Sequence, residues 1–178
     1  MRFIITFFAS YILIILYVAC SHSNTSQLKH ITTLETDILK DQTYLNSIDI
    51  NELNNHLKVA ELNLLRLENK ELDSISVELI YFQYRDYLNC INDIQKCIAK
   101  HNLLKKELGI NTIQLSNIKL DYQRSNKERS DLDTHLIHET KLIQHTSKSI
   151  VELIDKFNNQ SEQFDSLNKY IENIINEN

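Results

Sequence analysis

The chain has 178 residues with one glycine, no proline and no tryptophan, and its formal net charge is −5. Sheet-rich and α/β folds need glycine and proline at many turns, so this composition excludes most of them and favours a few long helices in one domain. No basic run is long enough to predict binding to nucleic acid, and we expect none. The modest acidic charge indicates no particular partner.

Residues 3–19 form an apolar segment that follows Arg2 and is interrupted only by Thr6 and Ser10. A positive start, an apolar centre and small residues before a cut are typical of a secretory signal peptide, which we place at residues 1–19. The segment is also just long enough to stay as an uncleaved membrane helix. Either alternative puts the remaining chain outside the cytoplasmic membrane.

Val18, Ala19 and Cys20 follow one another at the end of this segment, and together they resemble the lipobox of bacterial lipoprotein signal peptides. The resemblance implies that Cys20 receives a diacylglycerol and becomes the first residue of the mature protein. Two or three acyl chains, such as palmitate, would then hold the protein firmly in a membrane. No Asp and no acidic cluster follows Cys20. By analogy with that family, we expect the anchor to lie in the outer membrane on its periplasmic side.

After a polar tether at residues 20–26, we expect one helical bundle over residues 27–178. The first helix, residues 27–48, is predicted by apolar side chains that recur every three, four or seven residues. These are Leu28, Ile31, Leu34, Ile38, Leu45 and Ile48. Asp49, followed three residues later by Glu52, is typical of a helix start. We therefore expect a break here, with a single unbroken helix as the alternative.

The second helix is predicted at residues 50–108. Lys105 and Lys106 followed by Gly109 are typical of a helix C-terminus, because glycine readily takes the left-handed capping conformation. Asn111 can then cap the next helix, so we predict a tight turn at Gly109 and an antiparallel hairpin. The residues at its tip, Lys105, Lys106, Gly109 and Ile110, are the predicted site for a protein partner or for self-association.

The third helix is predicted at residues 112–176, because apolar residues recur there in one heptad register across residues 115–174. Residues 123–131 carry no apolar side chain. The helix therefore either breaks at about residues 124–130 or continues with a solvated patch.

The number of helices in cross-section is predicted from the width of the apolar stripe. Apolar residues beside the heptad widen that stripe only in the C-terminal half of the third helix, which favours a third helix there. We expect residues 27–48 and 50–72 to pack beside residues 150–175, which gives three helices at the base and two at the tip. A one-residue slip of the stripe near residues 68–72 predicts weaker supercoiling of the second helix.

Cys90 and Cys97 lie seven residues apart on the predicted second helix, too far along its axis to bond to each other. They are either small buried hydrophobic residues or partners in an intermolecular disulfide. Cys97 and His101 are spaced to share a metal ion, although a structural site needs about four ligands and no others are evident. We expect no metal, no cofactor and no catalytic site. The rival hypothesis is a metal- or thiol-dependent carrier or enzyme that uses Cys90, Cys97 and His101.

Histidines, aromatic residues and charged core residues form three further groups with a predicted location. The histidines of the third helix are expected on its surface, with a metal or pH-sensing pair as the alternative; they are His135, His138 and His145. Aromatic residues around Arg85 are expected in the core, with a ligand or partner groove as the alternative; they are Tyr81, Phe82, Tyr84 and Tyr87. Glu139 and Arg129 occupy core heptad positions, where polar pairs can set the register of a bundle.

The mature region resembles small helical lipoproteins of Bacteroidota in its helical texture and in residues 116–122, which precede a polar break. The long hairpin also resembles periplasmic holdase chaperones, and Braun's lipoprotein is an analogue as a helical spacer. We therefore expect a membrane-tethered helical module that binds a protein partner or has a structural role. An immunity or exclusion lipoprotein is a further alternative.

Overall fold

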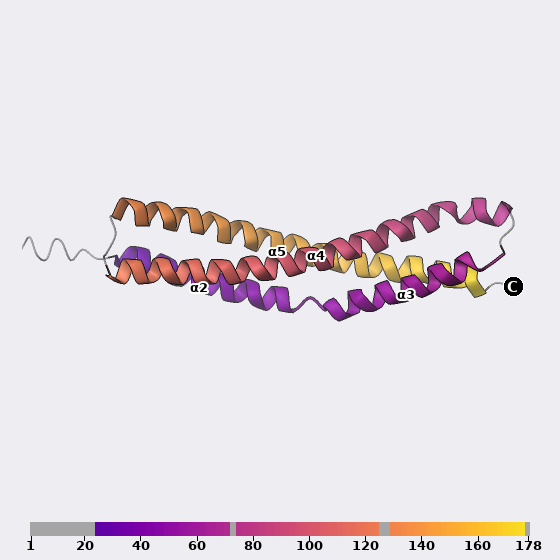
Figure 1. Ribbon diagram of the computed structural model, residues 1–178, viewed down its shortest axis with the longest axis horizontal. Helices are drawn as coiled ribbons and strands as arrows, with labels where there is room; N and C mark the ends of the chain where they lie inside the picture. The colour runs from indigo at the N-terminus through magenta and orange to yellow at the C-terminus, as the bar shows by residue number, and fades with distance from the viewer. Residues whose placement is uncertain (1–23, 72–73, 125–128, 177–178) are drawn as a thin grey trace, which may run out of the picture.

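The computed structural model describes residues 24–71, 74–124 and 129–176, and within these ranges it contains helices and no strand. The helices are α2 (Thr25–Asn46), α3 (Ile50–Glu68), α4 (Ser74–Arg124) and α5 (Arg129–Asn176). The predicted class, an elongated all-α antiparallel bundle, is confirmed (Figure 1). The predicted signal peptide, Cys20 and most of the tether lie outside the described residues.

Helices α4 and α5 run antiparallel along the whole rod, and α2 and α3 follow each other beside them (Figure 1). Lys119 of α4 forms an ion pair of 2.8 Å with Glu35 of α2, and Asn63 of α3 donates a hydrogen bond of 2.9 Å to Asn168 of α5. Three helices therefore share the cross-section in both halves. The 51 residues of α4 give the rod a length of about 76 Å, at about 1.5 Å per residue.

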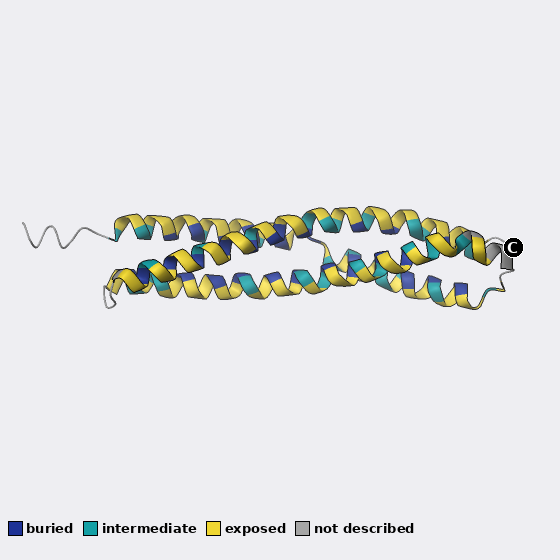
Figure 2. Cartoon of the chain, turned by 90° about the horizontal axis from the view of Figure 1, so that it is seen from above, coloured by how far each residue is buried: buried dark blue, intermediate teal, exposed yellow. Residues whose placement is uncertain are grey.

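The core is a heptad seam that both long helices share. Buried or partly buried positions in each helix alternate in steps of three and four, which keeps one face of each helix turned inward (Figure 2). In α4 they run from Tyr87 through Cys90, Ile94, Cys97, His101, Leu104, Leu108, Asn111, Leu115 and Ile118 to Tyr122. In α5 the heptad register predicted from the sequence is confirmed from Leu132 to Ile174.

The predicted helix start at Asp49 is also confirmed. The Asp49 carboxylate accepts hydrogen bonds from the backbone N–H groups of Asn51 at 2.9 Å and Glu52 at 3.3 Å, so it caps α3. Ile48 and Leu53 on either side of the cap are both buried. The break between α2 and α3 shifts the buried stripe by one residue, because a spacing of five separates these two core positions.

The predicted turn at Gly109 is wrong, because α4 continues through this residue for a further 15 positions to Arg124. Leu108 and Asn111 on either side of Gly109 are both buried and continue the heptad. Asn111 does not cap a new helix, because its amide donates to the Thr146 hydroxyl across the α4–α5 seam at 3.3 Å. The predicted helices at residues 50–108 and 112–176 are therefore incorrect.

The second helix break lies instead between α3 and α4, where the sequence showed only a slip of the stripe. Asn69 follows Glu68 as the C-terminal capping residue of α3, and its side-chain amide donates to the Leu65 carbonyl at 2.7 Å. Lys70 then donates to the last carbonyls of α5, at Ile174 and Ile175. These contacts fix the end of α3 against the end of α5, so the chain can reverse into α4 there.

The two short helices pack at opposite ends of the rod. Helix α3 and Lys70 do lie beside the C-terminal part of α5, as predicted for this region, but α3 runs parallel to α5 rather than antiparallel. The contacts that show this direction are Glu52 with Ser161, Asn63 with Asn168 and Lys70 with Ile174. Helix α2 packs at the other end of the rod, where Asn24 donates to the Tyr122 carbonyl. The predicted two-helix tip at Gly109 does not exist.

Of the two alternatives left open for residues 124–130, the structure has the break, since α4 ends at Arg124 and α5 begins at Arg129. The connecting residues 125–128 lie outside the described part of the chain. The reversal between the two long helices therefore falls in the segment without apolar side chains, which has nothing to contribute to a heptad core.

A substitution at Gly109 separates a helical interior from a turn. Nothing lies within 4 Å of the place a Cβ would occupy at Gly109, so Gly109→Ala should stabilise the protein by about 1 kcal/mol through helix propensity. We expect the midpoint of thermal unfolding, followed by circular dichroism, to rise by about 2–4 °C. Ala99→Gly, on the exposed side of the same helix, is the matched control and should lower it by a similar amount. A fall in the unfolding midpoint for Gly109→Ala would instead support a turn at this position and contradict a helical interior.

Candidate functional site

Cys90 and Cys97 are separate, free and buried in the α4 core stripe, with 1% and 2% of their surface exposed. Burial raises the pKa of the Cys90 thiol to about 11 and also raises the pKa of Cys97. The Cys90 thiol donates to the Gln160 carbonyl at a distance of 3.8 Å. A nucleophilic or metal-binding cysteine needs an accessible thiolate, so these two have the environment of structural core residues.

His101 is buried beside the break between α2 and α3. Its Nε2 lies 3.2 Å from the Leu45 carbonyl oxygen, which accepts the hydrogen bond. The ring therefore satisfies a carbonyl in the last turn of α2, where helix carbonyls lack intrahelical partners. Among the described residues, no group of three or more His, Cys, Asp or Glu side chains is placed to hold a metal ion. His101 is thus positioned as a capping residue for α2.

The buried polar residues form a feature that the sequence analysis did not identify. In one layer the side-chain amide oxygen (Oδ1) of Asn168 accepts hydrogen bonds from the Asn63 side-chain amide at 2.9 Å and from the Tyr87 hydroxyl at 2.8 Å. In another, Ser147 donates to the buried Asp41, whose pKa is raised by burial despite that bond. Their signal was available, because the buried members of these layers interrupt apolar stripes at core spacing. Such layers fix helix register and partner choice inside the bundle.

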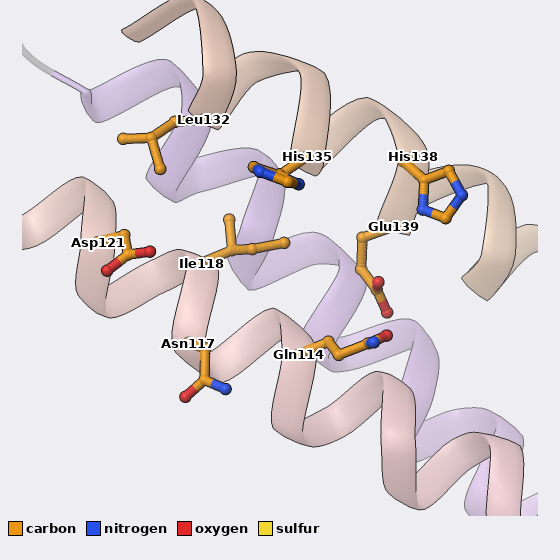
Figure 3. A pocket seen from close by; sticks show the side chains of 8 residues that line it. All are labelled: Gln114, Asn117, Ile118, Asp121, Leu132, His135, His138 and Glu139. Carbon is orange, nitrogen blue, oxygen red and sulfur yellow. The ribbon is translucent and has the colours of Figure 1, made fainter. Parts of the chain in front are cut away.

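Glu139 lies in the α5 core stripe and is 3% exposed. It lines a groove of about 240 Å³ at the α4–α5 seam, with Gln114 of α4 and His138 of α5 (Figure 3). The other residues that line the groove are Asn117, Ile118, Asp121, Leu132 and His135. The Oε1 atom of Glu139 is buried and has no hydrogen-bond partner, and burial raises the pKa of its carboxyl group while nearby His138 lowers it. Although Glu139 occupies a core heptad position where a polar pair could set the register, it forms no ion pair with a basic side chain in the described part of the chain.

The groove is too small and too open to serve as a typical small-molecule site. Such sites enclose roughly 300–1,000 Å³ and are mostly apolar, whereas this one is shallow and lined mainly by polar side chains. His135 and His138 are exposed at the edge of the groove, and His145 is exposed one heptad after His138 along α5. The predicted surface location of all three histidines is confirmed.

The aromatic cluster predicted around Arg85 divides between core and surface. Tyr87 is fully buried and stacks on Phe164 with ring centres 5.7 Å apart, and burial raises its pKa to about 12. Tyr81 and Phe82 are exposed, with ring centres 5.5 Å apart, and the Arg85 guanidinium carbon lies 5.3 Å from the Phe82 ring centre. The four aromatic side chains therefore do not form one groove.

The residues predicted for a hairpin tip lie in the interior of α4. Lys105, Lys106, Gly109 and Ile110 are all exposed, but they face solvent along the side of the rod and not at its end. Ile110 belongs to a larger set on this outer face of α4, which we call the α4 outer stripe. Its apolar members are Leu103, Ile110, Ile113 and Leu120, with 48%, 54%, 63% and 40% of their surface exposed. These aliphatic side chains therefore form an exposed apolar row along one face of α4.

No protein-family model, no curated protein and no solved structure matches this chain. Across residues 24–71, 74–124 and 129–176, no helix is both long enough and apolar enough to cross a bilayer.

The unpaired carboxyl group of Glu139 gives a pH-dependent prediction. A raised folded-state pKa means that Glu139 favours folding when protonated, and this contribution is lost as the pH rises above the ordinary value of 4.5 through the folded-state pKa. Glu139→Gln keeps the shape without the charge, so it should stabilise the protein at pH 7 by about 1 kcal/mol. The gain should vanish near pH 4 in thermal unfolding measured across the pH range.

Glu162→Gln is the matched control, because Glu162 is exposed on the same helix, and it should change little at either pH. If Glu139→Gln instead destabilised the protein at neutral pH, the carboxylate would have a favourable partner and the account of this groove would be wrong.

Proposed function

We propose that this protein is a membrane-tethered helical module of the bacterial cell envelope, which binds a protein through the side of its rod. The α4 outer stripe is the observation that carries the proposal. Its four aliphatic side chains are each at least 40% exposed, although every one of them could have been polar without loss of the core. Keeping apolar surface in water lowers solubility, so such a stripe is best explained by a partner that covers it.

The sequence around Cys20 supports the tether. Asn24 is the fourth residue after Cys20, so an acyl anchor on Cys20 would hold the start of α2 within about 14 Å of the lipid. Asn24 bonds to the Tyr122 carbonyl, at the end of the rod where α4 finishes. The anchored end is therefore the end that carries the α4–α5 connection, and the α4 outer stripe begins near it.

The rival role as a thiol or metal carrier is disfavoured by the environment of its own residues. Cys90 and Cys97 are buried with raised pKa values, and His101 is bonded to a backbone carbonyl. An immunity or exclusion factor would be one specific form of the binding module, because such a protein also acts by covering a partner.

Lipidation at Cys20 is tested by metabolic labelling with an alkyne analogue of palmitate in the native bacterium. The full-length chain should carry the label and partition with membranes, whereas Cys20→Ser should lose the label. Cys97→Ser is the control and should keep the label, because its thiol is buried in the folded chain. An unlabelled wild-type protein would contradict the proposed anchor.

Binding through the stripe is tested with a photoreactive phenylalanine analogue placed at Ile113 in the full-length chain in living cells. Irradiation should give a discrete covalent adduct with a protein, because Ile113 is the most exposed aliphatic residue of the stripe. The same analogue at Val151, 51% exposed on α5, is the control and should give much less adduct. Equal or absent adducts at both positions would contradict the proposed function.

A further inference from the structure

The α4 outer stripe reads the same from either end. Its six positions are Leu103, Lys106, Ile110, Ile113, Asn117 and Leu120, in alternating steps of three and four residues. From both ends the order is leucine, polar, isoleucine, isoleucine, polar, leucine. All six are exposed, and the stripe continues through Gly109 because α4 is unbroken there. Alternating steps of three and four define a coiled-coil seam, here on the side of α4 opposite the bundle core.

We propose that the α4 outer stripe pairs with the same stripe of a second copy of this chain, antiparallel about a two-fold axis between Asn111 and Thr112. This proposal rests on the proposed binding role and names the partner. A two-fold interface must match its own surface when reversed, and this stripe meets that condition at every position. Leu103 meets Leu120 of the second copy, Ile110 meets Ile113, and Lys106 meets Asn117.

Charge separates the antiparallel from the parallel arrangement. A parallel pair in register would set Lys106 against Lys106, which places like charges together at the seam. The antiparallel pair sets Lys106 against the neutral Asn117 and brings Lys100 near Asp121 of the second copy. The two Lys–Asn layers also oppose a shift of register, because a shift of one heptad would set Lys106 against Ile110 in one direction and against Arg124 in the other.

The sides of the stripe allow close approach. Gly109 faces open space, with nothing within 4 Å of its absent Cβ, and in the antiparallel pair it lies opposite Ser116 of the second copy. Small residues at this edge let the two helix backbones come near each other. The seam spans about 26 Å with four aliphatic layers, so we expect weak pairing in dilute solution. Confinement to a membrane raises the effective concentration and strengthens it.

The pairing also fixes how two anchored copies meet. Each α2 begins beside Tyr122 of its own α4, so the two anchored ends lie on opposite sides of the axis, about 32 Å apart along the rods. Two copies in one bilayer can therefore pair only when their rods lie along the membrane surface. Copies that stand upright can pair only when they come from facing membranes.

Paired cysteine substitutions in the full-length chain test the register. Leu103→Cys and Leu120→Cys are placed on separate chains with different epitope tags and co-expressed, and the membranes are then treated with a mild oxidant. A disulfide-linked species that carries both tags should form. Either variant alone should give none, because identical positions lie about 26 Å apart in the antiparallel pair. Cross-linking of either variant alone, or no mixed species, would overturn the proposal.

Two controls keep the outcome interpretable. Adding Ile113→Lys to both chains should abolish the mixed species, whereas Val151→Lys, at an exposed position of α5, should leave it unchanged. Circular dichroism of each variant verifies the fold. If the mixed species is absent while the photoreactive group at Ile113 still captures another protein, self-pairing is wrong and the binding role stands. If neither is seen, both are wrong.

Discussion

The α4–α5 seam is the interaction on which the rest of the molecule depends. Two helices of 51 and 48 residues bury one continuous heptad stripe against each other. Many isoleucine, asparagine and serine residues lower the helix propensity of both helices, so propensity alone does not make either one stable. Burial along the seam supplies the stability, and the short helices α2 and α3 then cover the remaining open side. Everything that faces outward, including the α4 outer stripe, takes its position from the register of this seam.

Polar residues in the seam make that register specific. A uniform aliphatic seam could slide by a heptad at little cost, whereas Asn111 must reach Thr146 and Tyr87 must reach Asn168. Displacement of either pair would leave buried polar atoms without partners, at roughly 1–3 kcal/mol each. Within the described residues, Oε1 of Glu139 has no such partner, and neither have Nδ1 of His101 and Oε1 of Gln160 in the same seam. The buried carboxyl group of Glu139 lowers stability, and it lines the same groove as Asn117 on the outer face of α4.

Periodicity made the class, the register of α5 and the Asp49 break predictable, and it left the 124–130 break as one of two alternatives. The position of the hairpin was not predictable, because the lysines and the glycine at residues 105–109 resemble a helix end more closely than the slip of the apolar stripe near residues 68–72 does. A lone glycine costs only about 1 kcal/mol inside a long helix, less than the burial on either side of it repays. Asn111 resembled a capping residue because its partner, Thr146, lies 35 residues away in the sequence. The buried polar positions interrupt the apolar stripes visibly, but their pairing across helices leaves no local pattern in the sequence.

The continuity of α4 through Gly109 is the central claim, and a single distance tests it. Gln95 and Gln123 are exposed on α4, and each lies 14 residues from Gly109. Spin labels at these two sites, in a chain with the buried Cys90 and Cys97 changed to alanine, can be measured by pulsed electron–electron double resonance. An unbroken helix predicts a separation of about 42 Å. A separation of about 10–15 Å, as in a hairpin that turns at Gly109, would contradict the account.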